Sequence, residues 1–558
     1  MKRLNAVLPF IPHPSSRSGS KTSLIPYFSL LLWVLPLVIL RSTQQSLMAH
    51  DEGIYAMQAR SLLLTGDWVT PQWGSGYSFD RTIGIQWLIA GCFWLFGTSE
   101  GTARLPSAIA WILSVLLTYQ IGCFLLNARL AWLGAAIFSV IPLVVQYGRL
   151  ATQDAVLVLI ELVGIWALLE AGSQKRPFWY ILAGSMFGVG FLIKGFMVIP
   201  AAIALLPYAI RHRHLLNPWL YLGLVLGAVL PVGWMLAAIR QYGNLSPVEG
   251  LFGKLFHLGE QTYLGAGRFY YFWNIPANGF PWVFFALGGV WWTLRDQRLR
   301  ELVSSNRSWL LLVGYPAILF VELTLFGTKT HYYPLQLMPF VGLLAAIALD
   351  QLIHFYQTRQ NRTLLTSLNL LLGCLALILI ALAVGIQVSP QIRAALGEDV
   401  ERGAIVGLLI GLGWLGTAIA WFRREQIGLV RSSQQWMAGL LLTSWLALAT
   451  MNLTGFWGNY SPKLKTFLQQ STVQAVLRSH PINFVVNEER LSRGDRKTYL
   501  LLNFYTPNIG TFSTQNIDTS SKLRQAAYAW IDPNLAKLPH PNKQIVATFE
   551  GWQLVSSK

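Results

Sequence analysis

The chain has 558 residues, of which 54% are hydrophobic and only 12% are charged, and its mean hydropathy is +0.46. This composition excludes a soluble globular protein and indicates a polytopic membrane protein. The net charge of +18 is expected in cytoplasmic loops, where Lys and Arg face anionic lipids, so we expect no nucleic-acid partner. The three cysteines lie in apolar surroundings and indicate neither a disulfide framework nor a zinc motif.

Apolar runs with the length of a membrane span, roughly 20 residues, recur along residues 24–455. The first run, Leu24 to Leu40, follows basic residues and is not closed by a clear cleavage site, so we interpret it as an uncleaved first span. In total the sequence predicts about thirteen spans, near residues 24–42, 105–126, 130–147, 154–171, 178–194, 196–211, 217–239, 278–294, 308–327, 334–353, 364–387, 404–422 and 435–455.

The distribution of Lys and Arg predicts how the chain is threaded. With a cytoplasmic N-terminus, every predicted inner loop is basic, as the positive-inside rule requires. The same threading places the C-terminus and four other polar segments on the outer side, namely 51–104, 148–154, 241–277 and 328–333. The sequence therefore predicts a multi-pass protein of the plasma (inner) membrane whose unusual polar residues all lie on the extracytoplasmic face.

After Gly455 the composition becomes more polar and the apolar runs shorten to strand length. This change predicts a membrane domain over 1–455, with its first outer loop at 43–104, and a small extracytoplasmic α/β domain over 456–558, long enough to hold a core of its own. Within the second domain we expect a helix at Ser471 to Leu477, strands at 482–486 and 499–504, and a terminal hairpin of 544–549 with 552–555.

The first outer loop is unusually rich in charged and aromatic residues. Apolar residues recur at helical period over 51–64 and again over 83–96, which predicts two short helices in the plane of the membrane interface. Asp51 and Glu52 would begin the first helix, where the helix N-terminus favours carboxylates. Such polar groups are costly at a membrane face, so we expect this loop to hold the chemistry.

A series of residues in this loop carries a family resemblance: Asp51-Glu52, Tyr55, Gly66-Asp67-Trp68, Pro71, Phe79-Asp80-Arg81, Trp87, Phe96-Gly97 and Arg104-Leu105-Pro106-Ser107. In this order they resemble the first periplasmic loop of the family-39 glycosyltransferases, GT-C membrane enzymes that include protein O-mannosyltransferases and the lipid A aminoarabinose transferase. The resemblance implies a mainly α, polytopic GT-C fold. It also implies inverting transfer of a sugar from a polyprenyl phosphate to an extracytoplasmic acceptor, which is a membrane lipid such as lipid A, an envelope glycan or a protein.

Two other functions stay open beside this one. Protein O-mannosylation is an alternative within the same enzyme class. A lipid or glycan transporter without chemistry is an alternative from another class, although inverted repeats and charges near the bilayer midplane, which would favour it, are not apparent in the sequence.

Three carboxylates are candidates for catalysis: Asp51, Glu52 and Asp154. The resemblance places Asp51 at the reaction centre, where a carboxylate can accept the proton of an attacking hydroxyl. If the acceptor is a phosphate, the same carboxylate can only orient or stabilise it. Capping of a helix is the competing interpretation of the acidic pair. The segment from Arg149 to Asp154 resembles the family's second site, and capping by Asp154 together with snorkelling by Arg149 remains the alternative there.

Four basic residues are candidate ligands of the donor phosphate: Arg81, Arg149, Lys329 and Arg268. Arg81 aligns with the basic residue of a family Glu-Lys-Pro motif, and its planar guanidinium suits a phosphate. Lys329 lies in a segment, 327–334, that resembles a family Lys-x-x-x-Tyr-x-x-Pro turn, although Lys and Tyr are also common anchors at membrane interfaces. Two tyrosines of these motifs are further substrate-binding candidates, Tyr55 and Tyr332.

The metal requirement is left unknown by the sequence. Asp80 replaces a family Glu that binds metal in the aminoarabinose transferase, and the shorter side chain reaches less far. His257 is the other candidate ligand, but the family His lies closer to the segment 268–271, which contains no His. Two ligands do not make a site, so a divalent metal stays an open option.

Overall fold

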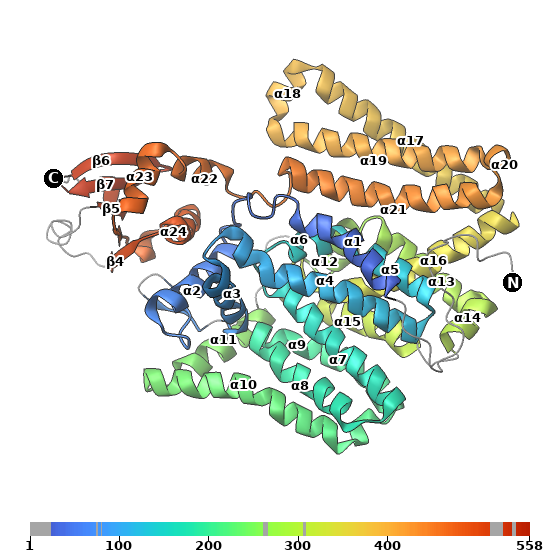
Figure 1. Cartoon of the computed structure of the whole chain (residues 1–558), viewed down its shortest axis with the longest axis horizontal. Helices are drawn as coiled ribbons and strands as arrows, with labels where there is room; N and C mark the ends of the chain where they lie inside the picture. The colour runs from blue at the N-terminus through green and yellow to red at the C-terminus, as the bar shows by residue number, and fades with distance from the viewer. Residues whose placement is uncertain are drawn as a thin grey trace.

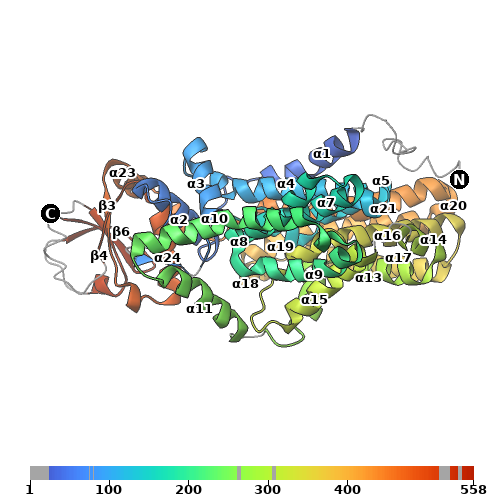
Figure 2. The same ribbon diagram turned by 90° about the horizontal axis from the view of Figure 1, so that it is seen from below.

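A helical bundle with a small α/β domain at one end makes up the chain in the computed structural model (Figure 1). The structure describes residues 24–73, 76–79, 81–260, 266–304, 309–513, 528–537 and 543–557. Figure 2 shows the α/β domain and the helical bundle following one another along the long axis of the molecule. We call the end of the bundle that carries this domain the loop end.

Long apolar helices with short connections form the bundle. In the described part of the chain, eight helical stretches are long and apolar enough to cross a membrane, or nine if α5 and α6, bent by 66°, form one span. The helices of this part are α1 (Ile25–Ile39), α4 (Glu100–Leu125), α5 (Ala128–Ser139), α6 (Pro142–Gly148), α7 (Asp154–Gln174), α8 (Pro177–Lys194), α9 (Val198–Arg211), α10 (Pro218–Tyr242), α11 (Ser246–Glu260), α12 (Tyr270–Asn278), α13 (Trp282–Arg295), α14 (Gln297–Ser304), α15 (Tyr315–Leu325), α16 (Met338–Thr358), α17 (Arg362–Val388), α18 (Pro390–Leu396), α19 (Glu398–Phe422), α20 (Arg424–Ile427) and α21 (Leu429–Thr454).

Each predicted span coincides with one or two of these helices, so the predicted polytopic helical fold is confirmed. The stretch from 177 to 211 shows how the chain reverses between spans. Gly195, at φ +57°, separates α8 from α9, a backbone conformation that glycine adopts without strain. Tyr180 near the start of α8 and Tyr208 near the end of α9 both lie 5.7 Å from the ring of His214. The two helices are therefore antiparallel.

The first loop contains two helices, as predicted: α2 (Glu52–Thr65) and α3 (Gly84–Phe96). They lie between the bundle and the α/β domain (Figure 1). A short hairpin of β1 (Gln72–Trp73) and β2 (Gly76–Tyr77) separates them. At Gly84 an added Cβ would lie 2.6 Å from the carbonyl oxygen of Leu192, so α3 begins in direct contact with the backbone of α8.

The α/β domain holds a five-stranded sheet with the order β4-β3-β5-β7-β6. Strand β3 pairs in parallel with β4 and β5, whereas β5, β7 and β6 are antiparallel. Its elements are α22 (Pro462–Leu468), α23 (Ser471–Ser479), β3 (Ile482–Val485), α24 (Arg493–Tyr505), β4 (Ile509–Ser513), β5 (Tyr528–Ile531), β6 (Lys543–Phe549) and β7 (Trp552–Ser557). The predicted helix at 471–477, the strand at 482–486 and the terminal hairpin are confirmed.

The prediction of a strand at 499–504 is wrong, because this segment is the second half of α24. Residues 498 to 504 are all buried, so their apolar run shows no amphipathic period from which a helix could be told from a strand. The helix is instead marked by its start, where the Ser492 hydroxyl accepts a hydrogen bond from the backbone N–H of Asp495, a helix N-cap.

Helices α8 and α10 approach closely through two glycine pairs with Gly-x-x-x-Gly spacing, Gly184 with Gly188 and Gly223 with Gly227. A Cβ added at Gly188 would lie 2.2 Å from the backbone of Gly227. Small residues at such a crossing allow the backbones to pack by van der Waals contact, which is the main attraction between helices in a membrane.

We therefore expect Gly188→Leu to push α8 and α10 apart and to lower the stability of the protein by about 1–3 kcal/mol, the usual cost of overpacking. The measurement is thermal unfolding of the purified protein in detergent. Gly233→Leu is the matched control, because Gly233 lies on α10 with no heavy atom within 4 Å of the added Cβ. Equal losses of stability in the two variants would contradict the close packing of α8 against α10 at Gly188.

Candidate active site

Charged and aromatic side chains from several distant segments meet at the loop end of the bundle. The ammonium of Lys194 at the end of α8 contacts the Asp154 carboxylate at the start of α7, and lies 4.8 Å from the centre of the Tyr332 ring. The guanidinium of Arg81 lies 5.1 Å from the centre of the Tyr55 ring. Both cations act electrostatically on Asp51. We call these residues, with Tyr147 and His331, the polar cluster.

Asp51 occupies the N-cap position of α2, but its side chain makes no capping hydrogen bond. The carboxylate is 28% exposed, and one oxygen lies 3.7 Å from Nδ1 of His50. Burial acts to raise the pKa of Asp51, but His50, Arg81 and Lys194 act against it and hold the pKa below its ordinary value. Asp51 is therefore an ionised, accessible carboxylate among cations.

The pair of Asp154 and Lys194 is much less accessible, because each side chain is only 7% exposed. Asp154 is the first residue of α7, but the N-cap is Gln153 and no side-chain capping hydrogen bond is formed there, so the capping interpretation is wrong. Its direct partner is Lys194, a residue that the sequence analysis missed. The available signal was an isolated lysine at the end of an apolar span, since an ionisable residue in such a segment is generally functional.

Aromatic residues line the side of the polar cluster next to α16. The hydroxyl of Tyr147 and Nε2 of His331 lie 2.8 Å apart, and the rings of Tyr147 and Tyr332 are 5.2 Å apart. Partial burial lowers the pKa of His331 below its ordinary value, although Asp154 and Asp51 act in the opposite direction. His331 lies in the predicted motif 327–334 but is not among the site residues predicted from the sequence.

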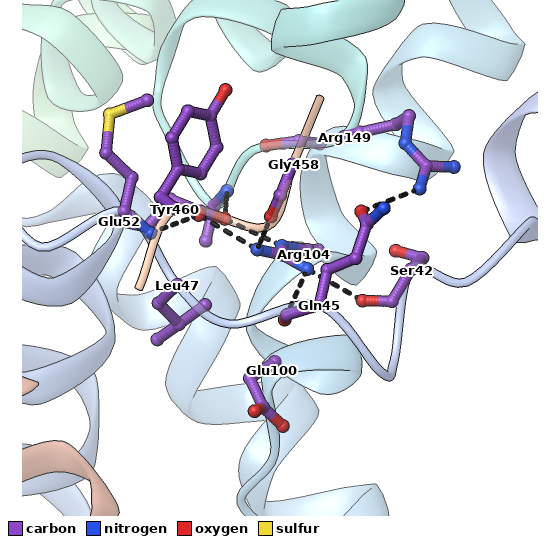
Figure 3. Close-up of polar contacts among 12 residues, drawn as sticks. Ser42, Gln45, Leu47, Glu52, Glu100, Arg104, Arg149, Gly458 and Tyr460 are labelled. Carbon is purple, nitrogen blue, oxygen red and sulfur yellow. Dashed lines mark hydrogen bonds and ion pairs between the residues drawn. The ribbon is translucent and has the colours of Figure 1, made fainter. Parts of the chain in front are cut away.

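Glu52 has a different environment from its neighbour Asp51, because its side chain is fully buried. The carboxylate accepts two hydrogen bonds from the guanidinium of Arg104, at 2.8 and 3.0 Å, and one each from the backbone N–H groups of Met48 and Ala151, at 2.8 and 2.9 Å. Arg104 also donates to the carbonyls of Ser42, Gln45, Ser46 and Gly458 (Figure 3). This arrangement assigns Glu52 to holding the loop in place and leaves none of its oxygens facing the polar cluster.

Arg149 also has a structural set of partners. Its guanidinium donates to the carbonyls of Leu37, Val38 and Leu40 at the end of α1 and to the side-chain oxygen of Gln45, a contact drawn in Figure 3. A buried arginine that satisfies the last carbonyls of a helix acts as its C-terminal cap. Arg149 therefore caps α1 and neither snorkels nor faces the polar cluster.

Of the three remaining candidates, one lies in the polar cluster and two do not. Tyr55 is buried beneath Arg81 and belongs to the polar cluster. Lys329 is buried in its own turn, where its ammonium donates to the Phe326 carbonyl at 2.6 Å. Arg268 is exposed in the turn before α12, and among the described residues no hydrogen bond or ion pair joins it to the other candidates.

Asp80, a candidate metal ligand, lies outside the described residues, and His257 is described only as part of the backbone of α11. Within the described ranges, no three His, Cys, Asp or Glu residues gather into a group that could hold a metal ion.

Comparisons with known proteins fit this architecture. Residues 80–235 match the family model described as dolichyl-phosphate-mannose-protein mannosyltransferase. An undecaprenyl phosphate-α-4-amino-4-deoxy-L-arabinose arabinosyl transferase of Pseudomonas fluorescens is 25% identical over 410 residues, which cover 69% of this chain and 70% of the relative. A transferase of the same name from Pseudomonas aeruginosa is 27% identical over 433 residues, or 75% and 73% of the two chains.

A solved structure has the same fold over nearly the whole chain. The crystal structure of ArnT from Cupriavidus metallidurans bound to undecaprenyl phosphate superimposes with a TM-score of 0.68 at 19% identity, covering 96% of this chain and 97% of that one.

Taken together, the fold, the polar cluster and these similarities define the chain as a membrane glycosyltransferase of the GT-C superfamily. Within that class it is similar to the aminoarabinose transferases and to the mannosyltransferases, as the resemblance of its first loop implied.

We expect Glu52→Ala to destabilise the protein by roughly 3–5 kcal/mol, because it leaves the buried guanidinium of Arg104 without its carboxylate. Thermal unfolding in detergent measures the effect. Glu398→Ala is the control, since it removes an ion pair of the same 2.8 Å length to Arg402 whose side chains are 84% and 32% exposed, and should cost less than about 1 kcal/mol. Similar melting temperatures for the two variants would refute the structural role of Glu52.

Proposed function

We propose that the enzyme transfers a sugar from a polyprenyl-phosphate carrier to an extracytoplasmic acceptor, with inversion at the anomeric carbon. The observation that carries the proposal is Asp51, a partly exposed carboxylate at the start of α2 on which two cations, Arg81 and Lys194, act electrostatically. The relatives, named for an undecaprenyl phosphate-linked aminoarabinose donor, support the same donor class. A lipid A-like lipid or an envelope glycan is the acceptor that this similarity favours.

The cations of the polar cluster suit the donor phosphate. Lys194 and Arg81 come from different elements and act on the same carboxylate, so an anion bound near Asp51 is close to both. The phosphate is also the leaving group. Positive charge fixed beside it stabilises the charge that develops as its bond to the anomeric carbon breaks. Arg149 and Lys329, predicted for this role, are bonded to backbone carbonyls instead.

Asp51 acts on the acceptor in this proposal. With a hydroxyl acceptor, the carboxylate takes the hydroxyl proton while the oxygen attacks the anomeric carbon and the carrier phosphate leaves on the opposite side. With a phosphate acceptor, which is already deprotonated, Asp51 only orients the attacking group. Asp154, paired with Lys194, keeps the ammonium in position and is not itself the base.

A protein hydroxyl is the second candidate acceptor. The matched family model, described as a protein mannosyltransferase, supports it over residues 80–235. The polar cluster serves both acceptors equally, because only the group attached to the attacking hydroxyl differs. Transfer of radiolabel from donor to a Ser/Thr-rich peptide or to an envelope lipid distinguishes them.

Asp51→Asn should reduce transfer to a hydroxyl acceptor by roughly 10²–10⁴-fold, the usual contribution of a positioned general base. Expression and binding of undecaprenyl phosphate should stay near wild type, because Asn keeps the size of the side chain. The pKa of Asp51 is held below its ordinary value of 3.8, so the carboxylate stays ionised and should cause no loss of turnover between pH 5 and 8 in the wild type.

Asp67→Asn is the matched control for this experiment. Asp67 lies in the same loop, and one of its oxygens accepts hydrogen bonds from the backbone N–H groups of Val69 and Thr70. An asparagine oxygen can accept the same bonds, so turnover should be preserved. Near-normal turnover of Asp51→Asn on a verified hydroxyl acceptor would show that Asp51 is not the base.

The polar cluster and the C-terminal domain are proposed to lie on the extracytoplasmic side, because the other end of the bundle carries the basic loops. Cysteines introduced at exposed Tyr77 and Lys537, in a background without the three native cysteines, should react with an impermeant reagent in intact cells. A cysteine at Ser173, at the opposite end of α7, should react only after lysis. The reverse pattern would contradict this orientation.

A further inference from the structure

A cavity of about 590 Å³ lies between the first loop and the C-terminal domain. The first loop contributes His50, and the domain contributes Lys463 on α22, Gly494, Lys497 and Thr498 on α24, and Glu550 in the turn between β6 and β7. This volume falls within the range of roughly 300–1,000 Å³ that is typical of small-molecule sites. It is large enough for the head group of a lipid and much larger than a packing defect.

The cavity is basic, and its positive groups are not used by the fold. Lys463 and Lys497 are both exposed, and among the described residues no hydrogen bond or ion pair engages either ammonium. Glu550 is the single carboxylate among the lining residues. Lysines on two separate elements that face one cavity are suited to an anionic group, and Lys binds phosphate as a point charge.

The floor of the cavity reaches the polar cluster. His50, which lines the cavity, lies 3.7 Å from the carboxylate of Asp51. The hydroxyl of Tyr460, another lining residue, accepts a hydrogen bond at 3.3 Å from the side-chain amide of Gln146, one residue before Tyr147 of the polar cluster. A molecule held in the cavity therefore has one end beside the proposed base, while the donor phosphate lies on the side of Arg81 and Lys194.

We infer that this cavity is the acceptor site, and that it binds the head group of a phosphate-bearing acceptor through Lys463 and Lys497. The inference rests on the proposed transfer reaction and adds the acceptor class and the residues that select it. The C-terminal domain is then a part of the acceptor site, since it supplies both lysines and most of the residues that line the cavity. The phosphate anchors the head group, and the attacking group on the same molecule faces Asp51.

The test measures binding of diphosphorylated lipid A in mixed micelles to the full-length protein in detergent, with the same lipid after phosphatase treatment as the uncharged probe. The double variant Lys463→Gln/Lys497→Gln should bind the phosphorylated lipid roughly ten-fold more weakly, because exposed lysine–phosphate contacts are individually modest. Its affinity for the dephosphorylated lipid should be unchanged. Added salt should weaken binding of the phosphorylated lipid to the wild type more than binding to the double variant.

Lys537→Gln is the matched charge control, because Lys537 is an exposed lysine of the same domain that does not line the cavity. Gly494→Leu is a second variant that tests volume rather than charge. A Cβ at Gly494 meets only the Ser492 hydroxyl oxygen, at 3.7 Å, so the helix tolerates the side chain while the cavity loses space. Gly494→Leu should weaken the binding of both the phosphorylated and the dephosphorylated lipid.

An unchanged affinity of the double variant for the phosphorylated lipid would overturn the acceptor site, as would an equal loss in Lys537→Gln. The acceptor site would also be overturned if a Ser/Thr-rich peptide, and not the phosphorylated lipid, occupied the cavity in a competition assay. The acceptor bound there would then be a protein. Binding of undecaprenyl phosphate is measured on the same samples. If the wild type fails to bind it, the proposed function fails; if it binds normally while the lysines have no effect, only the acceptor site fails.

Discussion

The buried ion pair of Glu52 and Arg104 is the interaction on which the arrangement of the loop end depends. Two buried charges are costly unless every polar atom is satisfied, and here the partners come from four separate parts of the chain. Arg104 of α4 donates hydrogen bonds to carbonyls of the segment 42–46 and of Gly458. Glu52 accepts hydrogen bonds from the backbone N–H groups of Met48 and Ala151. One pair thus joins the end of α1, the start of α2, the entry to α7 and the link to the C-terminal domain. Asp51 takes its position from this neighbour.

Two other buried arginines extend this frame by closing helices. Arg149 satisfies the last carbonyls of α1, and Arg60 of α2 donates to the carbonyls of Asn503, Phe504 and Pro507 at the end of α24. The second contact fixes the C-terminal domain against α2, and therefore against the helix that begins at Asp51. Cation contacts with helix C-termini are favourable, and the contacts of Arg60 also join the first loop to the C-terminal domain.

Much of the fold could be predicted because its signals are local. Span-length apolar runs located the bundle helices, and helical periodicity located α2 and α3. The site could be predicted only in part. Asp51 and Glu52 are adjacent in sequence and equally acidic, and only the three-dimensional partners separate an accessible carboxylate from one enclosed by Arg104. For the same reason Arg149 looked like a phosphate ligand, since the carbonyls that it caps lie more than a hundred residues away.

The charges of the polar cluster couple donor binding to the basicity of Asp51. Arg81 and Lys194 lower the pKa of Asp51, and a carboxylate with a lower pKa is a weaker base toward a hydroxyl. The same cations are the proposed ligands of the donor phosphate, whose negative charge would offset theirs. Donor binding should therefore raise the pKa of Asp51 towards its ordinary range. The free enzyme and the donor complex therefore differ in the basicity of Asp51, and the direction of this difference favours activation of the acceptor after the donor has bound.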